Sequence, residues 1–351
     1  TVADRATAYP LFGWRAGRRA ASLVRAGEID LVHGLGASVL GYALARRRDP
    51  ALRAPLVMNP QGLEEFGATR PGAARLKLIA YRPLQAAVRA SAHAADAVIA
   101  TDAALRPVVR SHLGVDDARI VTIPNAIDLD VIDALATPRD GAAIRSAHGI
   151  GPREWLMFSV GRLEQNKGFH VMIEALARLG DAVGPWRWVL AGDGPWRQRL
   201  RSLAAGTAVA SRIMMPGRLD DARLHAWYEA ADVFVHPTLY EGSSLVTLEA
   251  MAHRRAVIGT RAGGIPDKVR PGVNGWLVAP GDPETLRDAL RTAVSERDRV
   301  PHFGAHGREI VEREFAWTAV AAETEALYRR LLAPIEAHEA PGHATRPANG
   351  T

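Results

Sequence analysis

The residues DVFVHPTLYEGSSLVTLEAMA, from Asp232 to Ala252, place a β-rich run, a loop and the start of a helix in one stretch. Two glutamates in this stretch, Glu241 and Glu249, are eight positions apart. On one helix such residues lie about 80° apart around the axis and roughly 12 Å apart along it, so they cannot easily reach the same atom. With Glu241 in the loop and the helix starting near Ser244, the two carboxylates can bind two parts of one elongated ligand.

Outward from this stretch, short apolar runs alternate with segments of helical period along the chain. The expected strands form two series. The first comprises Ile29 to His33, Ala54 to Asn59, Asp96 to Thr101 and Arg119 to Asn125. The second comprises Trp155 to Gly161, Arg187 to Gly194, Arg212 to Gly217, Asp232 to Pro237 and Ala256 to Thr260. The alternation predicts an α/β fold of two doubly wound, Rossmann-like domains that face each other across a cleft.

The two series of strands set the expected domain boundaries. The first domain is expected over residues 1–127 and the second over 154–316. Residues 128–153, which are rich in proline and glycine, are interpreted as a linker. Apolar periodicity predicts a helix at 317–336, which can return to the first domain. The polar residues 337–351 are expected to form a disordered tail.

The composition restricts the class of protein. The chain has 351 residues, 48% of them hydrophobic, which is enough for two apolar cores. It has no cysteine, which excludes disulfides and thiolate metal sites and is typical of a reducing compartment. No apolar run reaches the roughly 18 residues of a membrane span, and no signal peptide is visible, so we expect a cytoplasmic protein. Because Thr1 to Gly27 reads as a helix, the first domain is expected to lack its opening strand.

The positive charge is concentrated in the first part of the chain. Residues 1–125 contain 17 lysines and arginines against 10 acidic residues, whereas the whole chain has a net charge of +6. A basic half indicates an anionic partner, and an anionic membrane surface fits peripheral binding at the inner face of the membrane. Nucleic acid is not expected, because Arg15, Arg18 and Arg19 lack the interleaved aromatics of a strand-binding surface. Solvated helix faces are the alternative interpretation.

Two loops that follow expected strands have features of a phosphate site. In GRLEQNKGF, Gly161 allows a tight turn, and Arg162 and Lys167 provide two cations that can bind a diphosphate. In AGDGP, Gly192 allows close approach of the backbone to a ligand. Such loops lie at the carboxyl ends of parallel strands, where open α/β sheets bind ligands. Each motif alone is also typical of an ordinary solvated turn.

Five pieces follow one another in the second half: VGRLEQNKG, AGDGP, the turn from Pro216 to Leu219, HPTLYEGSSLVTLEAMA and AGGIPDKVRPGVNGWLVAPGD. In this combination and order they resemble the C-terminal domain of the retaining glycosyltransferases of family 4, which have the GT-B fold. The resemblance extends from about Ile29 to Leu332 and is strongest from Val160 to Asp282.

The resemblance implies a role for each matching residue. Arg162 and Lys167 would contact the diphosphate of a nucleotide-sugar donor, Glu249 the ribose hydroxyls, and Glu241 the transferred sugar. Glu241, Arg162 and Lys167 are therefore the expected catalytic residues. The other expected donor contacts are Gly161, Gly192, Leu219, Gly242, Ser243, Ser244 and Leu245.

The activity implied by the resemblance is transfer of a hexose or related sugar with retention at the anomeric carbon. No cofactor or metal is expected, because the two cations can take the role of a divalent ion and no DxD-type pair follows a strand. The acceptor would be a glycan, a lipid-linked molecule or a small molecule. Two alternatives remain open, a nucleotide-sugar epimerase of the same fold and a non-catalytic protein that binds sugar nucleotides.

The acceptor side is expected in the first domain. Members of this family often have a histidine after a strand where this chain has MNPQG, so Gln61 stands at that position. The candidate acceptor contacts are His33, Asn59, Gln61, Glu65 and His93. In the second domain, Asp267 and Lys268 are expected only to cap a turn.

Overall fold

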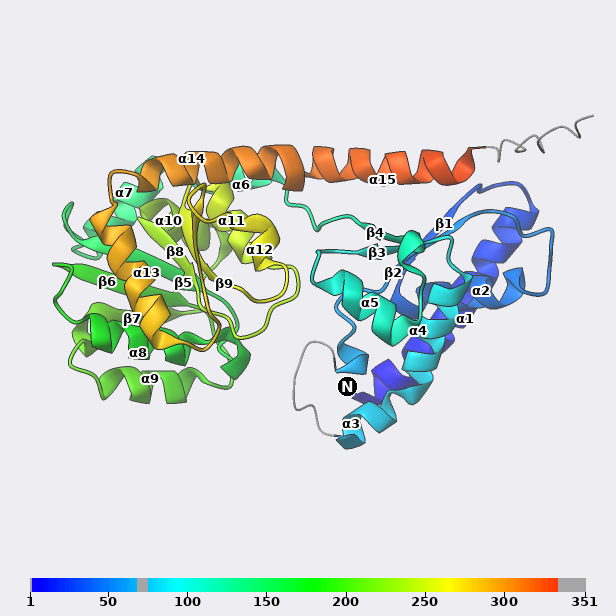
Figure 1. The fold of residues 1–351 in the computed structure, drawn as a ribbon, viewed down its shortest axis with the longest axis horizontal. Coiled ribbons are helices and arrows are strands. Elements are labelled where there is room, and N and C mark those ends of the chain that lie inside the picture. The colour runs from blue at the N-terminus through cyan, green and yellow to red at the C-terminus, as the bar shows by residue number, and fades with distance from the viewer. Residues whose placement is uncertain (1, 68–74, 334–351) are drawn as a thin grey trace, which may run out of the picture.

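The computed structural model describes residues 2–67 and 75–333, which form two α/β domains (Figure 1). The expected tail at 337–351 lies outside the described residues. Each domain contains one sheet, and every strand pair in both sheets is parallel. The expected α/β fold of two domains with parallel sheets is therefore confirmed.

The first sheet has four strands in the order β1-β2-β3-β4. They are β1 (Val32–Leu35), β2 (Leu56–Asn59), β3 (Ala97–Ala100) and β4 (Ile120–Thr122). The first strand begins three residues later than the run at Ile29 predicts. The strand order follows the chain, without the reversal that defines double winding.

Both faces of this sheet are covered. One face packs against the helices α1 (Val2–Arg25), α2 (Leu40–Arg46), α4 (Arg82–Ala94) and α5 (Leu105–Leu113). Helix α3 (Arg75–Ala80) contacts α1 and α4. The other face packs against α15 (Trp317–Leu332), whose Val320 and Leu327 form a cluster with Val57 and Ile99. Side chains alternate between the two faces of a strand, so Val57 contacts α15 while its neighbour Met58 lies in the other cluster.

The segment 128–153 is helical and is packed onto the second domain. It contains α6 (Leu129–Leu135) and α7 (Pro138–Ala147), and α7 packs against α10 (Asp221–Ala230). The backbones of α7 and α10 are close together at Gly141, because a Cβ on this residue would lie 2.6 Å from the carbonyl carbon of Glu229. The proline and glycine that indicate a linker have other roles here, because Pro138 starts α7 and Gly149 makes the turn after it.

The second sheet is doubly wound, with six strands in the order β10-β9-β8-β5-β6-β7. The strands are β5 (Trp155–Val160), β6 (Trp186–Ala191), β7 (Ile213–Gly217), β8 (Val233–His236), β9 (Ala256–Thr260) and β10 (Gly275–Val278). The edge strand β10 is the one that the sequence analysis missed, because its four residues start at a glycine and are only partly buried. The winding reverses between β5 and β8, and this is where such sheets bind ligands.

Helices cover both faces of the second sheet (Figure 1). One core contains α8 (Phe169–Leu179), α9 (Arg197–Ala205) and α13 (Pro283–Ser295). The opposite core contains α10, α11 (Leu245–Ala252) and α12 (Ile265–Lys268), together with a π-helical turn, Val311–Phe315, that follows α14 (Val300–Ile310). Short 3-10 turns lie at Gly36–Val39, Glu64–Phe66, Asp117–Arg119, Gln165–Lys167 and Ala210–Arg212.

The chain crosses between the domains twice, and the two crossings are hydrogen-bonded to each other. Ile127 donates its N–H to the carbonyl of Phe315 at 2.9 Å, and Trp317 donates to the carbonyl of Ile127 at 3.1 Å. Helices α14 and α15 run end to end across this point, from the second domain onto the first (Figure 1). No helix in the described part of the chain is long and apolar enough to cross a membrane.

Candidate functional site

The candidate site lies where the winding of the second sheet reverses. Strands β5 and β8 are neighbours, and the loops that follow them meet at the carboxyl edge of the sheet. The loop after β5 carries Arg162 and ends in the 3-10 turn that contains Lys167. The loop after β8 carries Glu241 and leads into α11. Residues far apart in the chain are therefore brought to one place.

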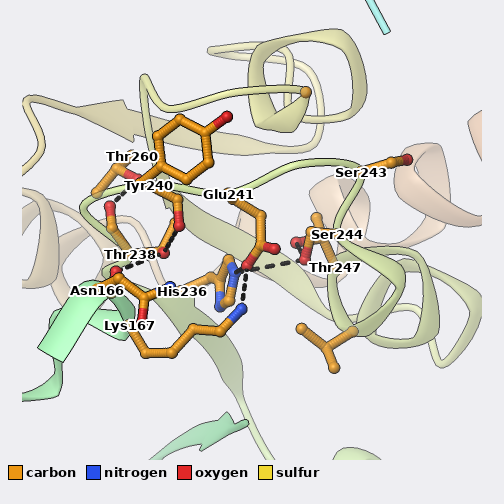
Figure 2. Close-up of polar contacts among 12 residues, drawn as sticks. Asn166, Lys167, His236, Thr238, Tyr240, Glu241, Ser243, Ser244, Thr247 and Thr260 are labelled. Atoms are coloured by element: carbon orange, nitrogen blue, oxygen red, sulfur yellow. Dashed lines mark hydrogen bonds and ion pairs between the residues drawn. The ribbon is translucent and has the colours of Figure 1, made fainter. Parts of the chain in front are cut away.

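Lys167, Glu241 and His236 form a polar cluster at this edge (Figure 2). The Lys167 Nζ lies 2.6 Å from Glu241 Oε2, and the His236 Nε2 lies 3.0 Å from the same oxygen. The side chains of Lys167 and Glu241 are only 20% and 15% exposed, so water screens the ion pair weakly. One carboxylate thus joins the loop after β5 to the end of β8.

The surroundings of Glu241 keep it ionised. Burial alone raises its pKa, but the hydrogen bond and charge of His236, together with Lys167, outweigh burial and lower the pKa of Glu241 to about 2. At neutral pH the group is a carboxylate that accepts hydrogen bonds and has no proton to give.

His236 is a site residue that the sequence analysis did not single out. It is the last residue of β8 and is fully buried. The ionised Glu241 can only accept, so Nε2 donates to it, whereas the Nδ1 has no hydrogen-bond partner in the described structure. The available sequence signal was a polar residue at the end of an otherwise apolar strand, immediately before the loop.

Backbone and hydroxyl contacts hold the two loops together (Figure 2). The Thr238 Oγ1 lies 2.9 Å from the carbonyl of Asn166 and 2.8 Å from the carbonyl of Tyr240. The Thr260 hydroxyl, at the end of β9, donates to the carbonyl of Thr238 at 2.7 Å. Because three strand ends are connected in this way, Lys167 and Glu241 are attached to one rigid edge.

Glu249 lies within α11, eight residues after Glu241. Its Oε2 accepts a hydrogen bond from the Tyr228 hydroxyl at 2.9 Å. Burial raises the pKa of Glu249, although the Tyr228 hydrogen bond acts in the opposite direction. The two glutamates therefore differ in environment: Glu241 is paired with a cation, and Glu249 with a neutral donor.

The remaining expected donor contacts are spread around this cluster. Arg162 is 68% exposed and pairs with Glu164 at 2.9 Å, so it does not share the ion pair of Lys167. Gly192 allows the loops after β5 and β6 to touch, since a Cβ there would lie 2.0 Å from the carbonyl oxygen of Gly161. Leu219 packs on the apolar core, and Leu245, at the start of α11, is exposed.

The loop from Glu241 to Ser244 also faces the first domain. Ser244 is buried and lies before the first residue of α11, where its hydroxyl accepts from Thr247 at 3.0 Å. Glu241, Gly242 and Ser243 line a cavity of about 280 Å³ between the two domains. The other residues that line this cavity are Gln61, Gly62, Thr101, Asp102, Ala104, Leu105, Val108, Asn125, Tyr240 and Gly263.

Of the five candidate acceptor contacts, Gln61 lines this cavity. Asn59 does not line the cavity, and its Oδ1 accepts a hydrogen bond from the backbone N–H of Gln61 at 2.9 Å. His33 contacts α15 instead, with Nδ1 at 2.5 Å from the Tyr328 hydroxyl. The remaining two are held within the first domain, where His93 Nε2 lies 2.7 Å from the Leu113 carbonyl and the Glu65 carbonyl accepts from Gln85 at 2.8 Å. Asp102 and Asn125, which follow β3 and β4, also line the cavity and were not predicted from the sequence.

Asp267 and Lys268 do more than cap a turn. The Asp267 carboxylate accepts from the Ala103 N–H at 2.7 Å and so connects the two domains. Lys268 is buried, and its Nζ lies 3.2 Å from both the Ser243 hydroxyl and the Gly264 carbonyl. Burial lowers the pKa of Lys268, and neighbouring carboxylates act against this effect. The motif after β9 thus supports the loop that carries Glu241.

Comparison with known proteins identifies the family. The model described as "Glycosyl transferases group 1" matches residues 140–310, and the model described as "Glycosyltransferase Family 4" matches residues 4–131. The chain therefore belongs to the family 4 glycosyltransferases. The resemblance inferred from the motifs is confirmed.

Curated relatives and solved structures agree with this assignment. The alpha-maltose-1-phosphate synthase of Mycolicibacterium smegmatis is 31% identical over 70% of this chain and 66% of its own length. The D-inositol 3-phosphate glycosyltransferase 2 of Catenulispora acidiphila is 32% identical over 70% of this chain and 58% of its own length. The matched region thus spans less than two thirds of these relatives. The Anabaena protein HepE, solved in complex with UDP, has the same GT-B fold, with a TM-score of 0.71, 22% identity and coverage of 88% of this chain and 81% of HepE.

Proposed function

We propose that this protein transfers a hexose from a nucleoside diphosphate to a hydroxyl group of an acceptor, with retention of the anomeric configuration and without a metal ion. The main support for the proposal is the cluster of Lys167, Glu241 and His236. This cluster lies where the winding of the second sheet reverses, and its Glu241 is in the loop that leads into α11. Membership in a glycosyltransferase family supports the reaction class.

The donor is proposed to lie along α11, with its two ends at the two glutamates. Arg162 and Lys167 would bind the diphosphate, and the free N–H groups at the start of α11 would add a positive dipole. Glu249, within the helix, would accept hydrogen bonds from the ribose hydroxyls. In this arrangement the carboxylates of Glu241 and Glu249 bind separate parts of one elongated ligand.

In the proposed reaction, the bond between the anomeric carbon and the diphosphate oxygen breaks, and a bond to the acceptor oxygen forms. Negative charge grows on the departing diphosphate, where Lys167, Arg162 and the helix dipole would stabilise it. Positive charge grows on the sugar ring. Because Glu241 is ionised, it would accept hydrogen bonds from sugar hydroxyls and stabilise that positive charge. The proton of the acceptor hydroxyl leaves with the diphosphate or passes to solvent.

The acceptor is proposed to enter the cavity between the domains. Gln61 and Asn125 reach this cavity from the first domain, and Glu241 reaches it from the second. These polar groups suit the hydroxyls of a glycan, a lipid-linked sugar or a small molecule. The sugar of the donor and the acceptor would then meet beside Glu241.

The donor site can be tested by thermal unfolding with UDP, GDP, ADP and dTDP sugars. A nucleotide sugar present at 100 times its dissociation constant should stabilise the parent by about 2.7 kcal/mol. Glu249→Ala and Arg162→Ala should each lower this stabilisation to about 1.4 kcal/mol or less at the same ligand concentration, because the loss of one proposed contact weakens binding about tenfold or more. Glu323→Ala, on the exposed side of α15, is the matched control and should respond like the parent. A folded parent that responds to none of these nucleotide sugars would contradict the proposal.

We also infer peripheral contact with an anionic membrane. Helix α1 exposes the apolar side chains Leu11, Phe12 and Trp14 next to the exposed arginines Arg15 and Arg18. Exposed apolar and basic side chains on one helix are typical of binding at a lipid interface.

In a vesicle assay, the parent is expected to sediment with phosphatidylserine-containing vesicles and much less with pure phosphatidylcholine. A Phe12→Ser/Trp14→Ser variant should lose most of this binding, because it removes apolar area from the exposed surface. Equal binding of parent and variant to both vesicle types would rule out this surface.

A further inference from the structure

Tyr228, in the last turn of α10, is fixed by aromatic neighbours on several sides. Its side chain is fully buried. The ring packs edge-on against Phe158, with centroids 5.0 Å apart, and lies 5.4 Å from Phe234. It also stacks on His253 at 5.5 Å, with only 10° between the ring planes. The position of the hydroxyl is therefore determined by the core and not by solvent.

This hydroxyl points at the carboxylate of Glu249. It lies 2.9 Å from Glu249 Oε2 and 3.2 Å from the carbonyl of Val246. A tyrosine has one proton, and the shorter contact to the charged acceptor takes it. Burial, followed by the charge of Glu249, raises the pKa of Tyr228 well above its ordinary value, so the hydroxyl keeps its proton and is a donor at neutral pH.

The contact leaves the second oxygen of Glu249 available. Among the described residues, Glu249 Oε1 accepts no hydrogen bond, whereas Oε2 is held by Tyr228. A glutamate side chain that is already fixed loses less conformational entropy when a ligand binds. Since Tyr228 is itself buried, it acts on a ligand through Glu249 and not by direct contact.

We propose that Tyr228 is a positioning residue that orients Glu249 for the ribose hydroxyls of the donor. This inference rests on the proposed function, in which Glu249 binds the ribose. It goes further by assigning a role to a residue outside the binding surface. A purely structural role for Tyr228 is the competing explanation, and the two predict different responses to changes in the nucleotide.

The experiment measures, by calorimetry, the binding of UDP, 2′-deoxy-UDP and 3′-deoxy-UDP, or the same series of whichever nucleotide stabilises the parent. The parent should bind the ribonucleotide about tenfold more tightly than the analogue that lacks the contacted hydroxyl, as expected for a hydrogen bond to a charged group. In Tyr228→Phe this ratio should fall to about one, while the affinity for that deoxy analogue stays as in the parent. Tyr42→Phe is the matched control, since it also removes a buried hydroxyl, one that donates to the carbonyl of Ala54 in the first domain.

A second measurement combines two substitutions. Adding Tyr228→Phe to Glu249→Ala should not change the nucleotide affinity further, because Tyr228 acts through Glu249. Equal weakening of all three nucleotides in Tyr228→Phe, or an unchanged ratio, would overturn the positioning role and leave the donor site intact. A parent that binds nucleotides without distinguishing ribose from deoxyribose would overturn the ribose contact. A parent that binds no nucleotide would overturn the proposed function as well.

Discussion

Lys167→Met is expected to lower the free energy of unfolding by about 3 kcal/mol near pH 7, which is the order of the cost of breaking a buried ion pair. The substitution leaves the Glu241 carboxylate, 15% exposed, without its cation. It also removes the charge that we propose stabilises the departing diphosphate. Sugar transfer should therefore slow by about 100-fold to 1,000-fold, the usual effect of removing one stabilising group from a developing anion.

The stability effect of this substitution should depend on pH in a defined direction. The pKa of Glu241 is lowered in the folded state to about 2, from an ordinary value of 4.5. The ionised form therefore stabilises the folded protein by about 3 kcal/mol above the ordinary pKa, and this contribution is lost as the pH falls from about 5 towards 2. The difference between the parent and Lys167→Met should be largest at pH 7 and clearly smaller at pH 3.5. Urea unfolding at both pH values measures it.

A double substitution separates stability from function in this pair. Adding Glu241→Gln to Lys167→Met removes the unpaired charge, so most of the lost stability should return while sugar transfer stays slow. If Lys167→Met unfolds like the parent at pH 7, the ion pair does not stabilise the fold. The assignment of the donor site would then rest on the binding experiment alone.

Gly263→Ala is expected to destabilise the protein by about 3 kcal/mol and to weaken nucleotide binding. Gly263 has a φ of +52°, which is unfavourable for residues with a side chain. A Cβ at this position would lie 1.7 Å from the carbonyl oxygen of Glu241, a distance that no side chain adopts without movement of the backbone. The loop that carries Glu241 would have to move away from β9, at a cost typical of overpacking.

The matched control for this substitution is Gly272→Ala. Gly272 has a φ of +77°, but a Cβ there would meet no atom within 4 Å. The control should lose only the conformational cost, about 1 kcal/mol, and should keep its affinity for nucleotides. Unfolding in urea and titration with the nucleotide that stabilises the parent compare the two variants. If Gly263→Ala and Gly272→Ala are destabilised equally, the close contact between residue 263 and the Glu241 carbonyl does not affect stability.

Much of the fold follows from local sequence patterns. The alternation of apolar runs and helical segments predicts nine of the ten strands in the part of the chain that the structure describes, because burial of both faces of a parallel strand requires a short apolar run. The segment 128–153, where the structure has the helices α6 and α7, shows the limit of local patterns. Proline and glycine mark the ends of helices as well as linkers, and only the packing of α7 on α10 decides between these two uses.

The acceptor side shows why isolated polar residues are poor guides. His33 ends one expected strand and His93 precedes another, yet their rings are hydrogen-bonded to the Tyr328 hydroxyl and to the carbonyl of Leu113. Asp102 and Asn125 line the cavity but carry no local motif. Which polar residue reaches a cavity depends on the distance between two domains, and this distance is not encoded in a short stretch of chain.

The sequence by itself determined the strand, loop and helix from Asp232 to Ala252 and the separate positions of Glu241 and Glu249, because the helical period places them apart. The tertiary structure decided which residues meet: Lys167 contacts Glu241 across 74 positions, and Tyr228 contacts Glu249 across 21. The physical reason is that these contacts depend on strand order. Strands β5 and β8 are neighbours only because the winding of the sheet reverses between them, and this reversal brings the cation of one loop to the carboxylate of the other.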